Sequence, residues 1–194
     1  MNKIYIAIPN QGWIRQELAN WVHHWQHTYD CIIDFPTEVP IDQNRNAIVK
    51  EFLKTDAEYL LMVDADNPPT IDVVPLRAHD LDVVGFPTPV IHALKPDTLL
   101  WNVYQEYGEK YIAASSRGKG IQRVDVVGTG CIMIARKVLE KLKAPFNREL
   151  NEDGTNKHGE DAAFCRKAKR EGFKVWVAWD YPCNHYKEIN LVRL

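Results

Sequence analysis

Residues 59–69 read Tyr-Leu-Leu-Met-Val-Asp-Ala-Asp-Asn-Pro-Pro, and this stretch decides the fold. Its first five residues form an unbroken apolar run that ends abruptly at polar residues and prolines. Such a run indicates a short strand that is buried on both faces of a sheet. The two prolines prevent the strand from continuing. A strand of this kind is typical of an α/β protein with a helix-covered parallel sheet.

Asp64 and Asp66 come where the predicted strand ends. Residues two apart on a strand point to the same side, so both carboxylates are expected beside the carboxyl edge of the sheet, where open α/β folds bind ligands. Two close carboxylates repel each other unless a cation neutralises them, and Mg²⁺ typically binds one or two carboxylates together with substrate phosphates. Asp64 and Asp66 are therefore candidate metal ligands. The alternative is that they are ordinary turn residues before prolines.

The first half of the chain alternates between predicted strands and predicted helices. Strands are expected at 3–8, 29–34, 59–63 and 82–86, with helices at 13–25, 44–54 and, interrupted by a proline, 70–77. This alternation predicts a mostly parallel, helix-covered sheet.

The second half has a different pattern. We expect a hairpin from 100–105 and 111–114, two apolar runs within 121–134 split by a Gly-Thr-Gly triplet, a helix at 136–142, a helix from 159 to Gly172, and a strand at 173–179. The polar stretch 147–159 is predicted to be a loop, either a lid or plain surface.

Three further polar positions have two interpretations each. Arg45 opens the second predicted helix, where it could cap the helix or face a phosphate or ribose. Glu160 and Asp161 lie in the first turn of a helix, where the helix dipole favours acidic residues even without a function. His185 follows the last predicted strand and could be either structural or a ligand.

Composition limits the class of protein. The chain has 194 residues, 45% hydrophobic and 26% charged, which suits one domain over residues 1–194. A net charge of -2 provides no global basic field for nucleic acid, and no window reaches the roughly 20 apolar residues that span a bilayer. The four cysteines lack close pairing, and no signal-peptide core follows Met1, so we expect free thiols in a cytoplasmic protein.

Six short motifs occur in one order along the chain: Ile8-Pro9, Arg45-Asn46, Asp64-Ala65-Asp66, Val127-Gly128-Thr129-Gly130-Cys131 with Arg136 after it, Gly159-Glu160-Asp161 with Phe164-Cys165, and Asn184-His185-Tyr186. In this order and spacing they resemble glycosyltransferases of the GT-A fold, close to family 2, and in particular the compact single-domain versions of phage and bacterial genomes. The resemblance extends from Ile4 to about Tyr186, and Asp64-Ala65-Asp66 matches the DxD motif.

The resemblance implies a GT-A (Rossmann-like) three-layer α/β/α fold with a mostly parallel central sheet and a small antiparallel β region in the second half. Residues 1–86 would form the nucleotide-binding half and residues 87–194 the acceptor and catalytic half. The implied reaction is a metal-dependent, inverting transfer of a sugar from a nucleoside-diphosphate sugar, such as a UDP- or GDP-sugar, to an acceptor hydroxyl. A glycan, a protein and a modified DNA base are all possible acceptors.

The resemblance also implies roles for individual residues. Asp66, with Asp64 and His185, would hold Mn²⁺ or Mg²⁺ against the diphosphate, Asp161 would be the general base, and Glu160 would orient the acceptor. The residues implied to contact the donor are Pro9, Asn10, Asp34, Arg45, Asp64, Gly128, Thr129 and Gly130. The glycines would let backbone approach the sugar closely, whereas a simple turn or bulge is the alternative.

Two other functions compete with this interpretation. A sugar-phosphate nucleotidyltransferase would require a glycine-rich loop with Arg or Lys after the first strand, and Pro9-Asn10-Gln11-Gly12 is not such a loop. A non-catalytic binder of nucleotides or carbohydrates would not require the full acidic set. A processive polysaccharide synthase is disfavoured because no Gln-x-x-Arg-Trp motif follows Asp161.

Overall fold

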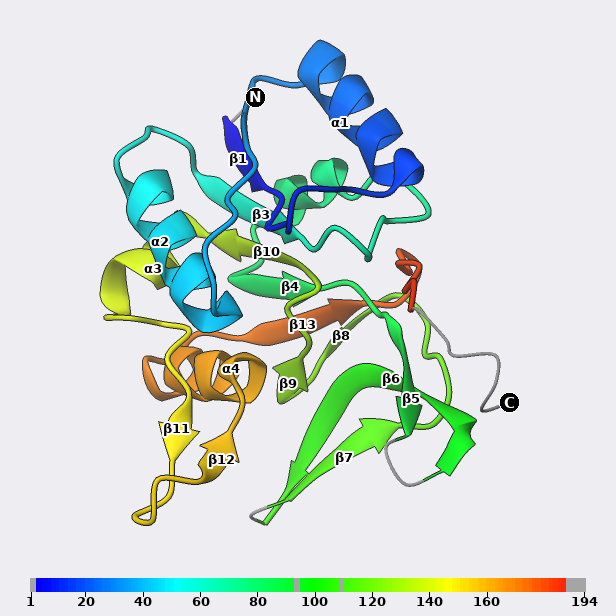
Figure 1. Cartoon of the computed structure of the whole chain (residues 1–194), viewed down its shortest axis with the longest axis vertical. Coiled ribbons are helices and arrows are strands. Elements are labelled where there is room, and N and C mark those ends of the chain that lie inside the picture. The colour runs from blue at the N-terminus through cyan, green and yellow to red at the C-terminus, as the bar shows by residue number, and fades with distance from the viewer. Residues whose placement is uncertain (1–2, 93–94, 109, 188–194) are drawn as a thin grey trace.

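The computed structural model describes residues 3–92, 95–108 and 110–187, in which the strands form one large sheet, a smaller four-stranded sheet and a two-stranded hairpin (Figure 1). The large sheet has seven strands in the order β2-β1-β3-β10-β4-β13-β8. These strands are β1 (Ile4–Ala7), β2 (Cys31–Asp34), β3 (Tyr59–Val63), β4 (Val83–Gly85), β8 (Ile121–Arg123), β10 (Cys131–Ala135) and β13 (Val175–Ala178).

Most strands of the large sheet run in one direction. β1 is parallel to β2 and β3, and β13 is parallel to β4. Because β3 and β4 are both antiparallel to β10, they share a direction, which leaves β10 and β8 as the reversed strands. The predicted α/β class with a mostly parallel central sheet is therefore confirmed.

The helices pack around this sheet at separate places (Figure 1). They are α1 (Gln16–Thr28), α2 (Ile41–Leu53), the 3-10 helix η1 (Val74–His79), α3 (Arg136–Lys141) and α4 (Glu160–Arg170). α1 contacts β2, α2 contacts α3, and α4 contacts β9 (Val126–Val127), β12 (Asn156–His158) and β13. α2 packs against β1 through the rings of Phe52 and Tyr5, which are in edge-on contact with centroids 6.0 Å apart.

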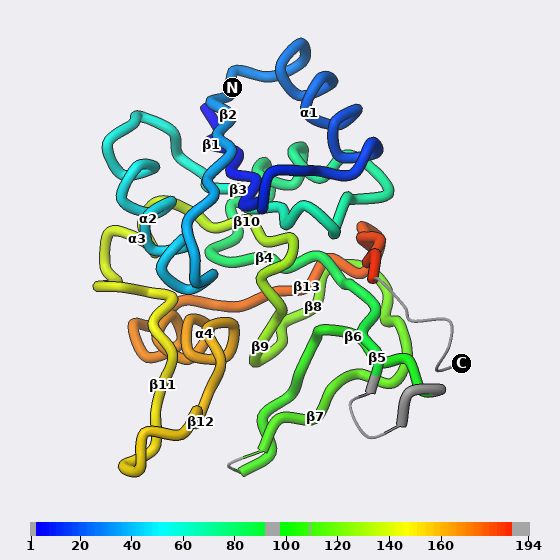
Figure 2. Tube along the Cα trace, in the orientation of Figure 1, coloured from blue at the N-terminus to red at the C-terminus, as the bar shows by residue number. Residues whose placement is uncertain are grey.

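The smaller sheet is antiparallel and comes from the second half of the chain, as predicted. It contains β5 (Pro89–His92), β6 (Lys95–Tyr107) and β7 (Lys110–Ala114), and β9 pairs with β6. Figure 2 shows β6 and β7 projecting together away from the large sheet. Since β9 leads into β10, the two sheets are joined beside α4.

The core is centred on β3 and β10, which lie side by side in the sheet. All five residues of each strand are buried, which explains why residues 59–63 are apolar without alternation. Strands this deeply buried cannot shift register without exposing apolar side chains. The ends of β3 and β10, where Asp64 and Gly130 lie, are therefore fixed positions.

Three sequence predictions about local structure are wrong. Trp13 precedes α1 and is 49% exposed, so it does not belong to the core-facing helix stripe. α2 begins at Ile41, which places Arg45 inside the helix instead of at its opening. The stretch 147–159 is not an irregular loop, because β11 (Glu149–Leu150) and β12 pair as a small hairpin.

Within the described residues, no helix is both long enough and apolar enough to cross a membrane.

A test of the packing between the two sheets uses Gly85, at the end of β4. A Cβ atom added there would lie 2.4 Å from the Cβ of Val127 on β9, which is far inside van der Waals contact. We expect Gly85→Ala to lower the free energy of unfolding by about 1–3 kcal/mol through overpacking, measured by urea denaturation. In the Gly85→Ala/Val127→Gly double variant, which removes the Cβ that the new methyl group would meet, the destabilisation should be smaller than the sum of the two single variants. Additive effects would contradict this contact.

Candidate functional site

The DxD motif lies at the carboxyl end of β3, in a loop that backbone hydrogen bonds hold in place. The Asp64 amide donates to the carbonyl of Gly130 at 2.7 Å, and the Asn67 amide donates to the carbonyl of Asp64 at 2.9 Å. The Asn67 side chain donates to the carbonyl of Asn184 at 3.0 Å. In Figure 2 the last part of the chain that the structure describes lies beside this loop, and backbone hydrogen bonds connect the two. The site therefore combines the middle of the chain with its end.

Asp64 pairs with a buried arginine. Arg45 Nη2 donates to Asp64 Oδ2 at 3.0 Å, and the Arg45 side chain is only 3% exposed. Burial raises the pKa of the Asp64 carboxyl, although the charge and hydrogen bond of Arg45 oppose that rise. Burial alone would lower the pKa of Arg45, but the charges of Asp64, Asp161 and Glu160 raise it. Arg45 is thus the cation shared by both acidic parts of the site.

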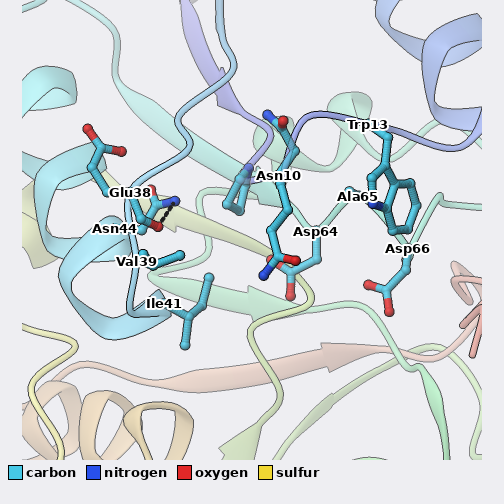
Figure 3. A pocket seen from close by; sticks show the side chains of 11 residues that line it. Asn10, Trp13, Glu38, Val39, Ile41, Asn44, Asp64, Ala65 and Asp66 are labelled. Atoms are coloured by element: carbon cyan, nitrogen blue, oxygen red, sulfur yellow. Dashed lines mark hydrogen bonds between the residues drawn. The ribbon is translucent and has the colours of Figure 1, made fainter.

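A cavity of about 260 Å³ opens beside Asp64 and Asp66. Figure 3 shows Asp64 near its centre, Asp66 beside the Trp13 ring, and Val39 with Ile41 on the opposite side. Its lining consists of Pro9, Asn10, Gln11, Trp13, Glu38, Val39, Ile41, Asn44, Asp64, Ala65 and Asp66. Polar and apolar side chains are mixed along this lining, and the Trp13 ring lies next to the Asp66 carboxylate, which suits a ligand with both a charged part and a flat organic part.

Asp66 faces the end of the described chain. Its Oδ2 lies 3.7 Å from His185 Nε2 and 3.1 Å from Lys187 Nζ. The Tyr186 amide donates to the Asp66 carbonyl at 3.0 Å, which fixes these partners next to the motif. The imidazole of His185 and the ammonium group of Lys187 therefore both lie next to one oxygen of the Asp66 carboxylate.

Asp66 and His185 fit two ligands of a divalent cation. The Nδ1 of His185 lies 2.7 Å from the Pro89 carbonyl and donates to it, so Nε2 is the ring nitrogen that faces Asp66. A backbone partner on the second ring nitrogen is usual for metal-binding histidines. Asp64 does not join them, and the described residues contain no group of three or more His, Cys, Asp or Glu side chains placed to hold a metal. Mg²⁺ and similar ions complete such a set with substrate phosphates and water.

The Gly-Thr-Gly triplet between β9 and β10 packs against protein groups. A Cβ at Gly130 would lie 2.4 Å from Asn67 Oδ1, and one at Gly128 would lie 2.5 Å from Asn102 Nδ2. Thr129 is 1% exposed and donates from Oγ1 to Asp161 Oδ1 at 2.9 Å. The glycines make room for two asparagine side chains, and Thr129 fixes the orientation of the Asp161 carboxylate.

Glu160 and Asp161 begin α4 and line a second cavity of about 230 Å³. Its other walls are Tyr104, Tyr111, Val126, Gly159 and Ala162. Burial raises the pKa of the Glu160 carboxyl, and the neighbouring charge of Asp161 raises it further. Thr129 occupies one oxygen of Asp161, so the other oxygen can accept a proton from a ligand.

The remaining predicted donor residues have different positions. Pro9 and Asn10 line the first cavity, where the Asn10 side chain accepts from the Gly12 amide at 2.8 Å. Asp34 ends β2 and accepts from the Tyr5 hydroxyl at 2.8 Å, outside that lining. Arg45 lies behind Asp64, so its influence on a ligand would pass through that carboxylate.

Sequence reasoning missed two residues of this site. Lys187 belongs to none of the motifs in the sequence, yet it contacts Asp66. Asn67, which separates the two aspartates from the prolines, has no role predicted from the sequence, yet it is 4% exposed and joins the loop to Asn184. The short separation of Lys187 from His185 is the one signal that could have identified it.

Comparison with known proteins shows the fold. No protein-family model and no curated protein matches the sequence. The crystal structure of A197 from STIV superposes with a TM-score of 0.66 at 20% identity, covering 97% of this chain and 87% of that one. GalNAc-T7, crystallised with UDP, GalNAc and Mn²⁺, superposes with a TM-score of 0.58 at 10% identity, covering 97% of this chain and 44% of that one. The chain therefore has a fold of the kind found in nucleotide-sugar proteins.

The raised pKa of Glu160 predicts a pH-dependent effect of Glu160→Gln on stability. A carboxyl whose folded-state pKa lies above its unfolded value destabilises the fold as pH rises through that folded-state pKa. Glu160→Gln should therefore raise the melting temperature at pH 8 and change it less at pH 5. Glu152→Gln, at an exposed acid in the turn between β11 and β12, controls for the lost charge. Equal shifts at both pH values would contradict the prediction.

Proposed function

We propose that this chain is a metal-dependent, inverting glycosyltransferase of the GT-A type, which moves a sugar from a nucleoside-diphosphate sugar to an acceptor hydroxyl. The observation that carries the proposal is the shared cation Arg45. It binds Asp64 of the DxD motif, and its charge also acts on Glu160 and Asp161 at the start of α4. A donor-binding acidic group and a candidate base thus lie around one guanidinium.

The donor half of the proposal rests on the first cavity and on Asp66. A divalent ion held by Asp66 and His185 would act as a Lewis acid that stabilises the leaving diphosphate. Lys187 pairs with this same carboxylate oxygen, so an ion bound to Asp66 would displace its ammonium group, which could then pair with the diphosphate. The related fold of GalNAc-T7, crystallised with UDP and Mn²⁺, supports UDP as the first nucleotide to test and Mn²⁺ as the first metal.

The acceptor half of the proposal rests on Asp161. The acceptor oxygen attacks the anomeric carbon from the face opposite the leaving group, and the bond from that carbon to the diphosphate oxygen breaks. The electron pair leaves with the diphosphate, and the proton of the acceptor hydroxyl passes to the free oxygen of Asp161. One base on the far side is sufficient for inversion. Thr129 keeps that carboxylate in a single orientation.

In this proposal one GT-A domain, with the three-layer arrangement of that fold, includes both halves. Residues 1–86 bind the nucleotide, because both Asp64 and Asp66 and the whole lining of the first cavity come from this part. Residues 87–194 supply Glu160, Asp161 and the second cavity. His185 and Lys187 join the two halves by returning to Asp66.

Two experiments separate this function from its competitors. A nucleotidyltransferase would release pyrophosphate from a nucleoside triphosphate and a sugar phosphate, whereas a glycosyltransferase would release nucleoside diphosphate from a sugar nucleotide. A non-catalytic binder would bind the sugar nucleotide without consuming it. Chromatography of the nucleotide products, with Mn²⁺ present, therefore distinguishes all three.

The first prediction of the proposal concerns Asp66. UDP and Mn²⁺ together, at about 100 times the dissociation constant, should stabilise the wild-type chain by roughly 2.7 kcal/mol, measured as a thermal shift. Asp66→Ala should remove most of this shift, and EDTA should abolish turnover. Asp56→Asn, at an exposed acid just before the amino end of β3, should leave the shift unchanged. A full shift or full activity in EDTA would exclude the metal role.

The second prediction concerns Asp161. Asp161→Asn keeps the size of the side chain and removes its basicity, so kcat should fall by about 10²–10⁴ while the UDP thermal shift persists. Thr129→Val should give a smaller loss because it removes the hydrogen bond to Asp161, and Thr129→Ser should retain activity. Proton NMR of the product should show the inverted anomer. A retained anomer, or normal kcat in Asp161→Asn, would remove Asp161 from this role.

A further inference from the structure

The second cavity differs in chemistry from the first. Glu160 and Asp161 place two carboxylates on one wall, and the rest of the lining consists of two tyrosines and small apolar groups. No lysine, arginine or histidine is among the seven residues that line it. A ligand that enters this cavity therefore meets negative charge and aromatic surface.

The nearest basic side chain of α4 is already neutralised. Arg166 Nη1 donates to Glu106 Oε1 at 2.8 Å and to the Tyr111 hydroxyl at 3.0 Å. Its Nε lies 3.5 Å from Glu149 Oε2, so two carboxylates surround one guanidinium. Lys169, one turn further along α4, is held by Glu106 and Asp125 at 3.0 and 2.8 Å. Neither cation is free to bind a phosphate in the cavity.

Neighbouring residues fix the positions of Tyr104 and Tyr111 in the lining of the second cavity. Tyr111 receives the hydrogen bond from Arg166, and its ring meets the His158 ring edge-on with centroids 5.4 Å apart. Tyr104 lies on β6 in register with Val126, which is another lining residue. Aromatic faces beside hydrogen-bond acceptors suit a ligand with an apolar face and a hydroxyl-bearing edge.

We infer that the acceptor is an uncharged saccharide, which lies against Tyr104 and Tyr111 and presents a hydroxyl to Asp161. This inference rests on the proposed function and identifies the substrate class of its acceptor side. A sugar ring has apolar C–H faces for the tyrosine rings and hydroxyl donors for both carboxylates. A nucleic acid or another phosphate-bearing acceptor would bring negative charge next to Glu160 and Asp161 in a cavity whose lining contains no cation, while Arg45 is already paired with Asp64.

A glycan array that displays neutral, sulfated and phosphorylated saccharides tests the inference with the full-length chain, both alone and with UDP and Mn²⁺. Wild-type protein should be retained on neutral glycans and not on the phosphorylated forms of the same glycans. Tyr104→Ala should weaken binding to the best neutral glycan by about five- to tenfold, since aromatic packing of this kind contributes that much. Tyr107→Ala is the matched control, because Tyr107 belongs to the same hairpin but is 78% exposed and lies outside the cavity lining. Glu160→Gln should reduce the discrimination against phosphorylated glycans.

Two results would overturn the inference. One is the absence of retention on every neutral glycan under both conditions. The other is stronger binding, measured by fluorescence anisotropy, of a serine- and threonine-rich peptide or of an oligonucleotide with hydroxymethylated bases. The thermal shift with UDP and Mn²⁺ is measured on the same protein. A normal shift with failed glycan binding would reject the acceptor class alone, whereas Tyr104-dependent glycan binding without any shift would reject the donor half of the proposed function.

Discussion

The ion pair between Arg45 and Asp64 is the constraint on which the rest of the site depends. The guanidinium of Arg45 belongs to a side chain that is only 3% exposed and requires compensating charge, because an unpaired buried charge is costly. Asp64 supplies one hydrogen bond, and the charges of Asp161 and Glu160 also favour the charged form of Arg45. Arg45 Nε and Nη1 and Asp64 Oδ1 have no hydrogen-bond partner among the described residues. The charges of the site are thus arranged in advance of a ligand, but some hydrogen-bonding atoms of Arg45 and Asp64 have no protein partner among the described residues.

This constraint explains why the two aspartates of the motif differ. The sequence predicts equivalent carboxylates, since residues two apart on a strand point to the same side. Asp64 instead turns toward the buried Arg45 inside α2, while Asp66 faces His185 and Lys187 from the end of the chain. Asp64 is therefore held by a buried guanidinium, whereas Asp66 is paired with the ammonium group of Lys187 beside the imidazole of His185. The end of the strand fixes the backbone position of each aspartate, and the charged partner determines the direction in which its carboxylate points.

The fold was predictable where burial dictates the residue type. β3 and β10 are buried along their whole length, so their apolar runs identify strands on both faces of a core. The polar stretch 147–159 was not predictable as a hairpin, because its two strands are short and mostly exposed and carry no apolar alternation. α2 was predicted too short because Pro40, which precedes its first turn, and Ile41 were assigned to the preceding loop. Proline just before or within a first turn is favourable, because its missing amide donor has no partner to lose there.

The contacts within the candidate site were not predictable from the sequence. The sequence and the resemblance propose Asp66, His185 and Asp161, and in the structure the contacts that orient them come from Lys187, Pro89 and Thr129. Each of these contacts joins segments far apart in the chain, for which one sequence gives no pairing signal. The glycines on either side of Thr129 show the consequence most directly. They resemble a place where a ligand approaches the backbone, whereas the space is filled by Asn67 and Asn102, which support the loops that carry Asp66 and Thr129.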